Sequence, residues 1–268
     1  MRGRSALTSL GDRLDVVAAH NGLSASGLKR LLTEDHTAWL SVDGRVFYIE
    51  DAPEQVNGES GVTALATLVP AYATSRTFTL HSNPGADRTI FLDFNGATIQ
   101  GTRWNIGSGG KIANGTHIGW DSDGVPSTFN SSEHAWIQEV WREVAESYAS
   151  MSVDVTTQDP GQAGWIRGSS SDTKYGTRVV VTGSNTAQSQ ACEGCLGIAW
   201  LGTFGMVDQA AVYQPAWVFA TNRNFAPMIV AQAPPTRPGT TWGSATTAWP
   251  ARATTAEPSR GARSWAPP

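Results

Sequence analysis

The run NSSEHAWIQEVWREVAESY at residues 130–148, followed by SVDVTT at 152–157, carries the clearest structural signal in the chain. In the first part, apolar residues recur at spacings of three and four, which predicts one buried face of a helix. These residues are Ile137, Val140, Trp141, Val144, Ala145 and Tyr148. Asn130 can cap this helix while Glu133 reaches back to it, the pattern of a capping box. The second part alternates like a strand, so the pair predicts an α/β or α+β fold with a mixed sheet.

Strand patterns continue along the chain on both sides of this pair. Four further runs rich in β-branched and aromatic residues predict strands at 89–94, 177–182, 196–201 and 217–220. The glycine-rich residues 101–129 are expected to form a long loop. The first fifty residues predict a small helical unit, with Ser24 as a helix cap, and then a hairpin that turns at Asp43 and Gly44.

Composition excludes several classes of protein. With 16% charged residues and a net charge of −4, the 268-residue chain lacks the basic surplus of a protein that binds nucleic acid by neutralising phosphates. No uncharged apolar run reaches the roughly 20 residues of a membrane span, and two cysteines are too few for a disulfide scaffold. Residues 1–4 are basic, but no apolar segment of a signal peptide follows, which predicts a cytosolic protein or a start further upstream.

Residues 232–268 differ in composition from the rest of the chain. They hold seven of the 14 prolines and a net charge of +3, against −7 for residues 1–231, and they contain no Leu, Ile, Val, Phe or His. A stretch without branched aliphatic residues cannot supply a packed core, so we expect it to be disordered. Pro234, Pro235 and Pro238 also exclude a helix at its start.

Two short motifs carry potential chemistry, and each has a plainer alternative. Cys192 and Cys195 form a single CxxC pair that cannot complete a four-ligand zinc site, so they are either a local disulfide or two unreactive thiols. The run from Asp121 to Gly124, with a second aspartate at Asp123, resembles the start of a calcium loop. Its third acidic position and distal glutamate are missing, which favours a turn.

The five histidines do not form a zinc motif. All of them precede residue 135 and no two lie at i and i+4 on a helix: His20, His36, His81, His117 and His134. We expect each to be an ordinary surface or loop residue, with His134 on the exposed side of its helix. A new zinc site built from His81, His117 or His134 has no support in their spacing.

Seven segments carry a resemblance to a known family. They are LHSNPGA (80–86), TIFLDFNG (89–96), DSDGVPSTF (121–129), IQEVWREVAE (137–146), VDVTTQDP (153–160), GIAWLGTF (197–204) and AWVF (216–219). Together they resemble the catalytic domain of secreted bacterial reprolysin-like zinc metallopeptidases, which are metzincins. The resemblance divides the chain into a propeptide-like region (1–55), a linker (56–76), a truncated metallopeptidase-like domain (77–231) and a tail (232–268).

This resemblance implies a fold, a site and a reaction. It implies a mixed twisted sheet in the order strand, helix, three further strands, a fifth strand and then an active-site helix just after Ala231. One of the three strands would be an edge strand that binds the substrate, at Gly197, Ile198, Ala199 and Trp200. The active-site helix would carry HExxHxxGxxH, whose histidines bind zinc and whose glutamate is the general base of peptide-bond hydrolysis. The family also implies secretion and a protein or peptide substrate, and we expect a monomer.

The chain departs from this pattern where the active-site helix should begin. Since residues 232–268 contain no histidine, we predict no catalytic residue and no zinc ligand in this chain, although zinc is the cofactor of the family. Without that helix, one face of the sheet is expected to be under-packed around Ile90, Val153 and Val180.

A slipped reading frame accounts for the tail. In the shifted frame, each new codon consists of the third base of one present codon and the first two bases of the next. Read in this way, the tail can encode the whole HExxHxxGxxH signature. Thr236, Thr240 and Thr246 lie at the spacing of the three histidines, and the codon of Trp242 fixes the glycine. The glutamate requires an Arg237 codon that begins with AG. We therefore expect a truncated or frameshifted metalloendopeptidase without activity.

The alternative is a non-catalytic, secreted binding or adhesion module in which the tail is a genuine Pro/Thr/Ala linker. Trp200 and Trp217, both on predicted strands, would then present a face that binds sugar or protein.

Overall fold

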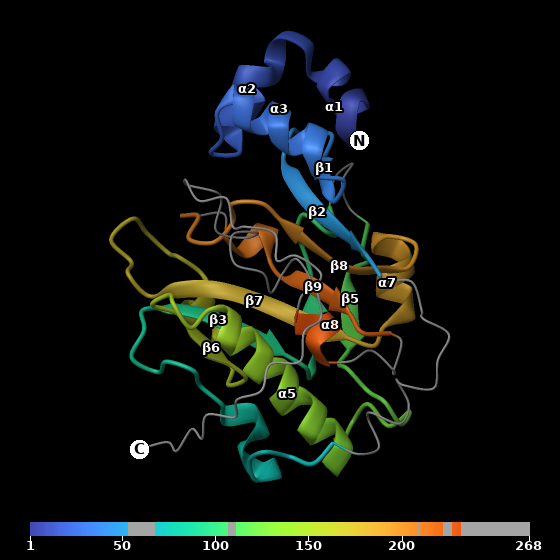
Figure 1. Ribbon diagram of the computed structural model, residues 1–268, viewed down its shortest axis with the longest axis vertical. Helices are drawn as coiled ribbons and strands as arrows, with labels where there is room; N and C mark the ends of the chain where they lie inside the picture. The colour runs from blue at the N-terminus through green and yellow to red at the C-terminus, as the bar shows by residue number, and fades with distance from the viewer. Residues whose placement is uncertain (53–67, 107–110, 208–209, 222–226, 232–268) are drawn as a thin grey trace, which may run out of the picture.

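The computed structural model describes residues 1–52, 68–106, 111–207, 210–221 and 227–231. They form the predicted α+β fold, with a seven-stranded mixed sheet in the order β1-β2-β8-β9-β7-β3-β6 and a two-stranded sheet of β4 and β5 (Figure 1). The strands are β1 (Ala38–Leu40), β2 (Val46–Asp51), β3 (Arg88–Asp93), β4 (Gly96–Ile99), β5 (Gly115–Ile118), β6 (Asp154–Thr156), β7 (Tyr175–Thr182), β8 (Cys195–Trp200) and β9 (Ala216–Phe219). The helices are α1 (Gly3–Leu10), α2 (Leu14–His20), α3 (Ala25–Glu34), α5 (Ser131–Ser147), α6 (Gln162–Trp165), α7 (Asn185–Ala191) and α8 (Pro227–Ala231), with short 3-10 turns η1 (Gly11–Arg13), η2 (Thr74–Thr79) and η4 (Ala210–Tyr213).

Helix α5 confirms the prediction made from the opening stretch. The side chain of Asn130 accepts a hydrogen bond from the backbone N–H of Glu133 at 3.0 Å, and Glu133 accepts one from the N–H of Asn130 at 2.8 Å, so the capping box is formed. The apolar stripe is buried against the sheet. Trp141 fixes the helix further, because its indole N–H donates to the backbone carbonyl of Val155 in β6 at 2.8 Å.

The central strands are covered on both faces. Strands β6, β3, β7 and β9 run parallel to one another, and the β7 run of Val179, Val180 and Val181 is completely buried, as expected for a strand between two layers. Helices α5 and α8 contribute to the hydrophobic cluster on one face. On the other face, α7 and β4 belong to a second cluster that is rich in aromatic residues.

The expected under-packing of the sheet is wrong. Ile90 and Val180 have no exposed surface and Val153 is 2% exposed. Ile90 and Val153 lie in the same cluster as the apolar stripe of α5, so this helix covers them. Val180 points the other way, into the aromatic cluster, and does not depend on a helix on the α5 face.

The prediction of a long loop at 101–129 is also wrong in part. Residues 115–118 form β5, which pairs antiparallel with β4 as a small separate sheet. Their sequence, GTHI, has no apolar run from which a strand could be predicted. The pairing depends on Gly96, whose φ is +86° and where a Cβ atom would lie 2.5 Å from the carbonyl oxygen of His117. A side chain there would collide with the partner strand.

The N-terminal region confirms its predicted elements and also joins the main sheet. Ser24 caps α3 by accepting a hydrogen bond from the N–H of Gly27 at 3.0 Å. Strands β1 and β2 form the predicted hairpin, and Gly44 in its turn has a φ of +80°. Beyond the hairpin, β2 pairs antiparallel with β8, so the N-terminal residues extend the sheet at one end (Figure 1).

Replacing Trp141 should test how far the fold depends on α5. Trp141→Ala removes a buried ring and should lower the free energy of unfolding by about 3–5 kcal/mol. Trp141→Phe keeps most of the packing but loses the hydrogen bond to Val155, so a loss of about 1–2 kcal/mol is expected. Urea unfolding followed by circular dichroism measures both, and equal losses for the two variants would contradict the role given to the ring.

Candidate functional site

The four residues predicted to bind substrate lie on β8, but β8 is not an edge strand. Gly197, Ile198, Ala199 and Trp200 are all buried, and β8 lies between β2 and β9. The predicted edge position is therefore wrong for this chain. The reason is that β2, which comes from the N-terminal region, pairs with the side of β8 that faces away from β9.

The tryptophans of the alternative binding module are buried as well. Trp217 has no exposed surface and Trp200 is 3% exposed. The ring of Trp200 packs against Trp104 at 4.7 Å, Phe47 at 5.3 Å and Tyr213 at 5.4 Å between centroids. The expectation that these two rings present a binding face is wrong, because they form part of the aromatic cluster between β8, β9 and the segments that cover them.

The CxxC pair forms a disulfide. Cys192 and Cys195 are bonded to each other. Cys192 follows the last residue of α7, and Cys195 is the first residue of β8. The bond therefore ties the end of the helix to the start of the strand that carries the predicted substrate residues.

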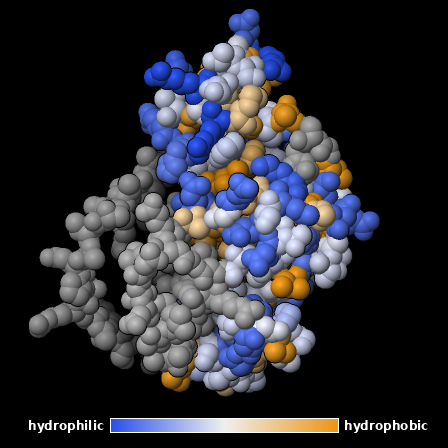
Figure 2. Space-filling view, turned by 90° about the vertical axis from the view of Figure 1, so that its right-hand side faces the viewer, coloured by the Kyte–Doolittle hydropathy of each residue, from blue (hydrophilic) through white to orange (hydrophobic). Residues whose placement is uncertain are grey.

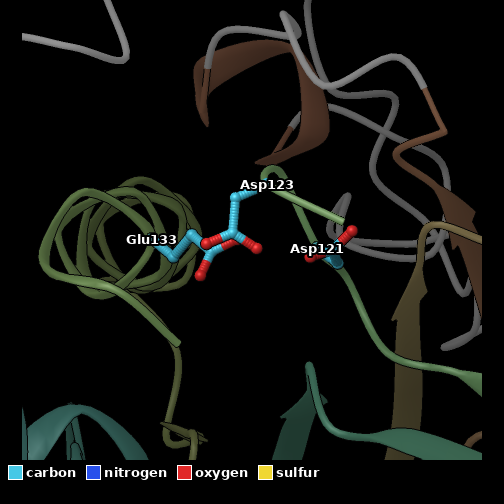
Figure 3. Close-up of side chains that lie close together, drawn as sticks. All are labelled: Asp121, Asp123 and Glu133. Atoms are coloured by element: carbon cyan, nitrogen blue, oxygen red, sulfur yellow. The ribbon is translucent and has the colours of Figure 1, made fainter. Parts of the chain in front are cut away.

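Three carboxylates gather at the N-terminal end of α5. Asp121 and Asp123 lie on the loop before the helix and Glu133 lies in its first turn, and oxygen atoms of all three lie within 4.8 Å of one another (Figure 3). The sequence identified the two aspartates and, separately, the cap at Glu133, but not that they meet. The sequence did contain a signal for this contact. A glutamate in the capping box of a helix can reach an Asp-x-Asp turn that lies shortly before the helix.

Hydrogen bonds within the loop account for the cluster. Both oxygens of Asp121 accept from the N–H of Gly124, and one also accepts from Val125, which confirms the predicted turn. Glu133 accepts from the backbone N–H and the hydroxyl of Ser122 at 2.7 and 2.9 Å. Carboxylates at a helix N-terminus also interact favourably with the helix dipole. The three groups thus hold the loop on α5.

These residues do not fit a catalytic zinc site. Zinc sites are built mainly from histidine nitrogen and cysteine sulfur, whereas an all-carboxylate set suits Ca²⁺ or Mg²⁺. Within the described ranges, the acidic cluster is the only group of three potential ligands found, and no histidine belongs to it. The predicted slipped-frame motif at 232–268 lies outside the described residues.

The histidines have separate partners. His117 is 7% exposed, with its ring at hydrogen-bond distance from the carbonyl oxygen of Ala113, so the expectation of a surface residue is wrong there. His134 is half-buried and its ring nitrogen lies 2.9 Å from the hydroxyl of Thr77. His117 is therefore held by the segment just before its own strand, and His134 by the η2 turn.

His81 and Asp154 form an ion pair at the β6 edge of the sheet. The Nδ1 atom of His81 lies 2.6 Å from Asp154, whose other oxygen accepts from the backbone N–H groups of Ser82 and Asn83. Burial alone would lower the pKa of His81, but the hydrogen bonds to Asp154 and Gln158 outweigh it and raise that pKa. The pair attaches the segment before β3 to β6.

Glu133 is expected to matter for stability through these hydrogen bonds. Glu133→Ala leaves three donors without their acceptor and should lower the free energy of unfolding by about 2–3 kcal/mol. Glu139→Ala on the exposed face of the same helix is the control, with an expected change of about 0.5 kcal/mol. A loss at Glu133 no larger than at Glu139 in chemical denaturation would contradict the structural role given to the cluster.

The His81–Asp154 pair should make stability depend on pH. Because folding raises the pKa of His81, its contribution is complete below the unfolded value of about 6.5 and disappears as the pH rises through the folded value. His81→Gln should therefore destabilise the protein more at pH 5.5 than at pH 8.5. The difference should not exceed about 1 kcal/mol because 31% of the His81 side chain is exposed. In an Asp154→Asn background the greater loss at pH 5.5 should disappear, and its persistence there would assign it to another group.

Comparison with known proteins adds no relative. No family model matches the sequence, and no curated protein or solved structure matches the chain. Among the described residues, no helix has the length and apolar character needed to cross a membrane.

Proposed function

We propose that this chain derives from a secreted zinc metalloendopeptidase of the reprolysin-like metzincin type, and that as written it does not hydrolyse peptide bonds. The observation that carries the proposal is the order of its elements. β3, α5, β6, β7, β8, β9 and α8 follow one another along the chain, with the β4–β5 pair and the short helices α6 and α7 between them. This is the order that the sequence resemblance implies.

The position of α8 supports the same proposal. It follows β9 and begins at Pro227, a few residues before the point where the resemblance places the start of the active-site helix. Val230 and Ala231 are buried in the cluster that contains the apolar stripe of α5. A helix that continued from this position would therefore extend from the core that α5 and the sheet share.

The disulfide supports the proposed location. Local disulfides persist in oxidising compartments and are rare in the cytosol. The bond between Cys192 and Cys195 thus favours an exported protein. Protein or peptide substrates and a monomeric state belong to the same proposal.

The loss of activity follows from the residues after Ala231. The tail contains no histidine, and the described histidines do not gather into a replacement site. A peptidase of this class takes both its nucleophile and its electrophile from the metal, so a chain without the three ligands should lose essentially the whole rate enhancement.

An activity assay with a repaired gene tests the proposal. The purified chain should not hydrolyse casein, with or without added zinc. The control is the same gene with one base inserted before codon 235, which should restore the metzincin signature and give hydrolysis that EDTA abolishes.

Two results would overturn the proposal. One is EDTA-sensitive hydrolysis by the chain as written. The other is a codon for Arg237 that begins with CG, which would overturn the slipped frame as the origin of the tail, since no glutamate can then be read in the shifted frame.

A further inference from the structure

Asparagine followed by glycine occurs at several places in the chain, and three of these pairs lie in the described residues. The three are Asn21 with Gly22, Asn95 with Gly96 and Asn114 with Gly115. A further pair, at Asn57, lies outside the described residues. Asparagine before glycine is prone to deamidation, because glycine has no Cβ atom to hinder attack of its backbone nitrogen on the asparagine side chain. The surroundings of each pair therefore decide which of them reacts in the folded chain.

The pair at Asn21 is locked by its own hydrogen bonds. Asn21 is 4% exposed. Its Nδ2 atom donates to the carbonyl oxygens of Val17 at 2.8 Å and Gly44 at 2.7 Å, and its Oδ1 atom accepts from the N–H of Val46 at 2.8 Å. Rotation of the amide toward Gly22 would break all of these bonds. This asparagine can therefore react only after local unfolding.

The pair at Asn95 is restricted at its glycine. Asn95 itself is exposed. A Cβ atom at Gly96, however, would lie 2.5 Å from the carbonyl oxygen of His117 and 2.6 Å from the backbone nitrogen of Gly119. The backbone of β5 and of the residue after it thus leaves Gly96 little room for the movement that ring closure requires.

The pair at Asn114 has neither restriction. Asn114 and Gly115, where β5 starts, are both exposed, and a Cβ atom at Gly115 would meet nothing within 4 Å. The Oδ1 atom of Asn114 accepts a hydrogen bond from the backbone N–H of Gly101 at 3.2 Å. A donor at this oxygen stabilises the negative charge that develops there when a nucleophile attacks Cγ. Among the described residues, no hydrogen bond holds the side-chain amide of Asn95 in this way.

We propose that Asn114 is a site of spontaneous deamidation in the folded chain. The backbone nitrogen of Gly115 loses its proton to solvent and attacks Cγ of Asn114, and a succinimide ring forms as Nδ2 leaves as ammonia. Water then opens the ring at either carbonyl and gives aspartate or isoaspartate. Water is the one co-reactant, and the described surface is mostly hydrophilic in the view of Figure 2, so exposed side chains are in contact with it. The reaction is independent of the proposed peptidase function.

Isoaspartate at this position would alter β5, because it routes the backbone through the side chain and lengthens it by a methylene group. Gly115 pairs with Ile99 of β4, which is 3% exposed and belongs to the aromatic cluster. A shift where β5 starts therefore reaches the core. An aged sample should unfold at a lower urea concentration than an equally aged Asn114→Asp sample, which carries the same charge on a normal backbone.

Peptide mapping by mass spectrometry tests the proposal on the full chain. The chain is incubated in mildly alkaline buffer, and the deamidated fraction at each asparagine is followed over time, with a zero-time sample to subtract deamidation during digestion. Asn114 should deamidate at least about tenfold faster than Asn21 or Asn95, because both of these wait for local opening of the structure. In concentrated urea the three rates should become similar, which separates the effect of the fold from that of the local sequence.

Two glutamine variants assign the reaction to its site. Asn114→Gln should remove the fast phase, because the longer side chain would have to form a six-membered ring. Asn95→Gln is the matched control at the other exposed asparagine and should leave the rate at Asn114 unchanged. Equal rates at Asn114 and Asn95 in the folded chain would overturn the proposal, and so would a folded chain in which Asn114 stays intact while the urea-unfolded chain reacts.

Discussion

The packing of α5 against the parallel strands organises the main core of this molecule. Its apolar stripe covers β3, β6 and β7 on one face, and without it Val179 and Val181 of β7 would lose much of their cover. Two polar contacts fix where the helix sits: the Trp141 indole on β6 and the Glu133 carboxylate on the loop before the helix. The first contact is buried and the second partly buried, so together they constrain the position of α5.

The cluster at Glu133 consists of three carboxylates, a composition that suggests a metal site, but their hydrogen bonds stabilise the fold. Asp121, Asp123 and Glu133 have the chemistry of a site for a hard cation, but their oxygens accept hydrogen bonds from the loop and from the helix start. Those bonds offset the repulsion among three carboxylates that lie close together. These bonds hold the loop at the entry into α5.

The pairing of β2 with β8 is the second constraint, and it connects fold with function. In the resemblance that the motifs carry, β8 would be the free edge that receives substrate. Here its outer hydrogen-bonding groups are used by the chain itself, and Phe47 completes the aromatic cluster around Trp200. The same contact helps to bury Trp200, so this ring does not present the face that was expected of it in a binding module.

Local sequence patterns were enough to predict α5 with its capping box, the strands of the main sheet and the N-terminal hairpin. Each depends on a local signal: the spacing of apolar residues, an alternating run, a capping residue or a turn glycine. Only the tertiary structure decided that β8 lies inside the sheet, that Glu133 meets the two aspartates, and that β5 exists. These features depend on contacts between residues far apart in the chain, such as Phe47 and Trp200. Local periodicity predicts that a strand forms but does not say which strand lies beside it.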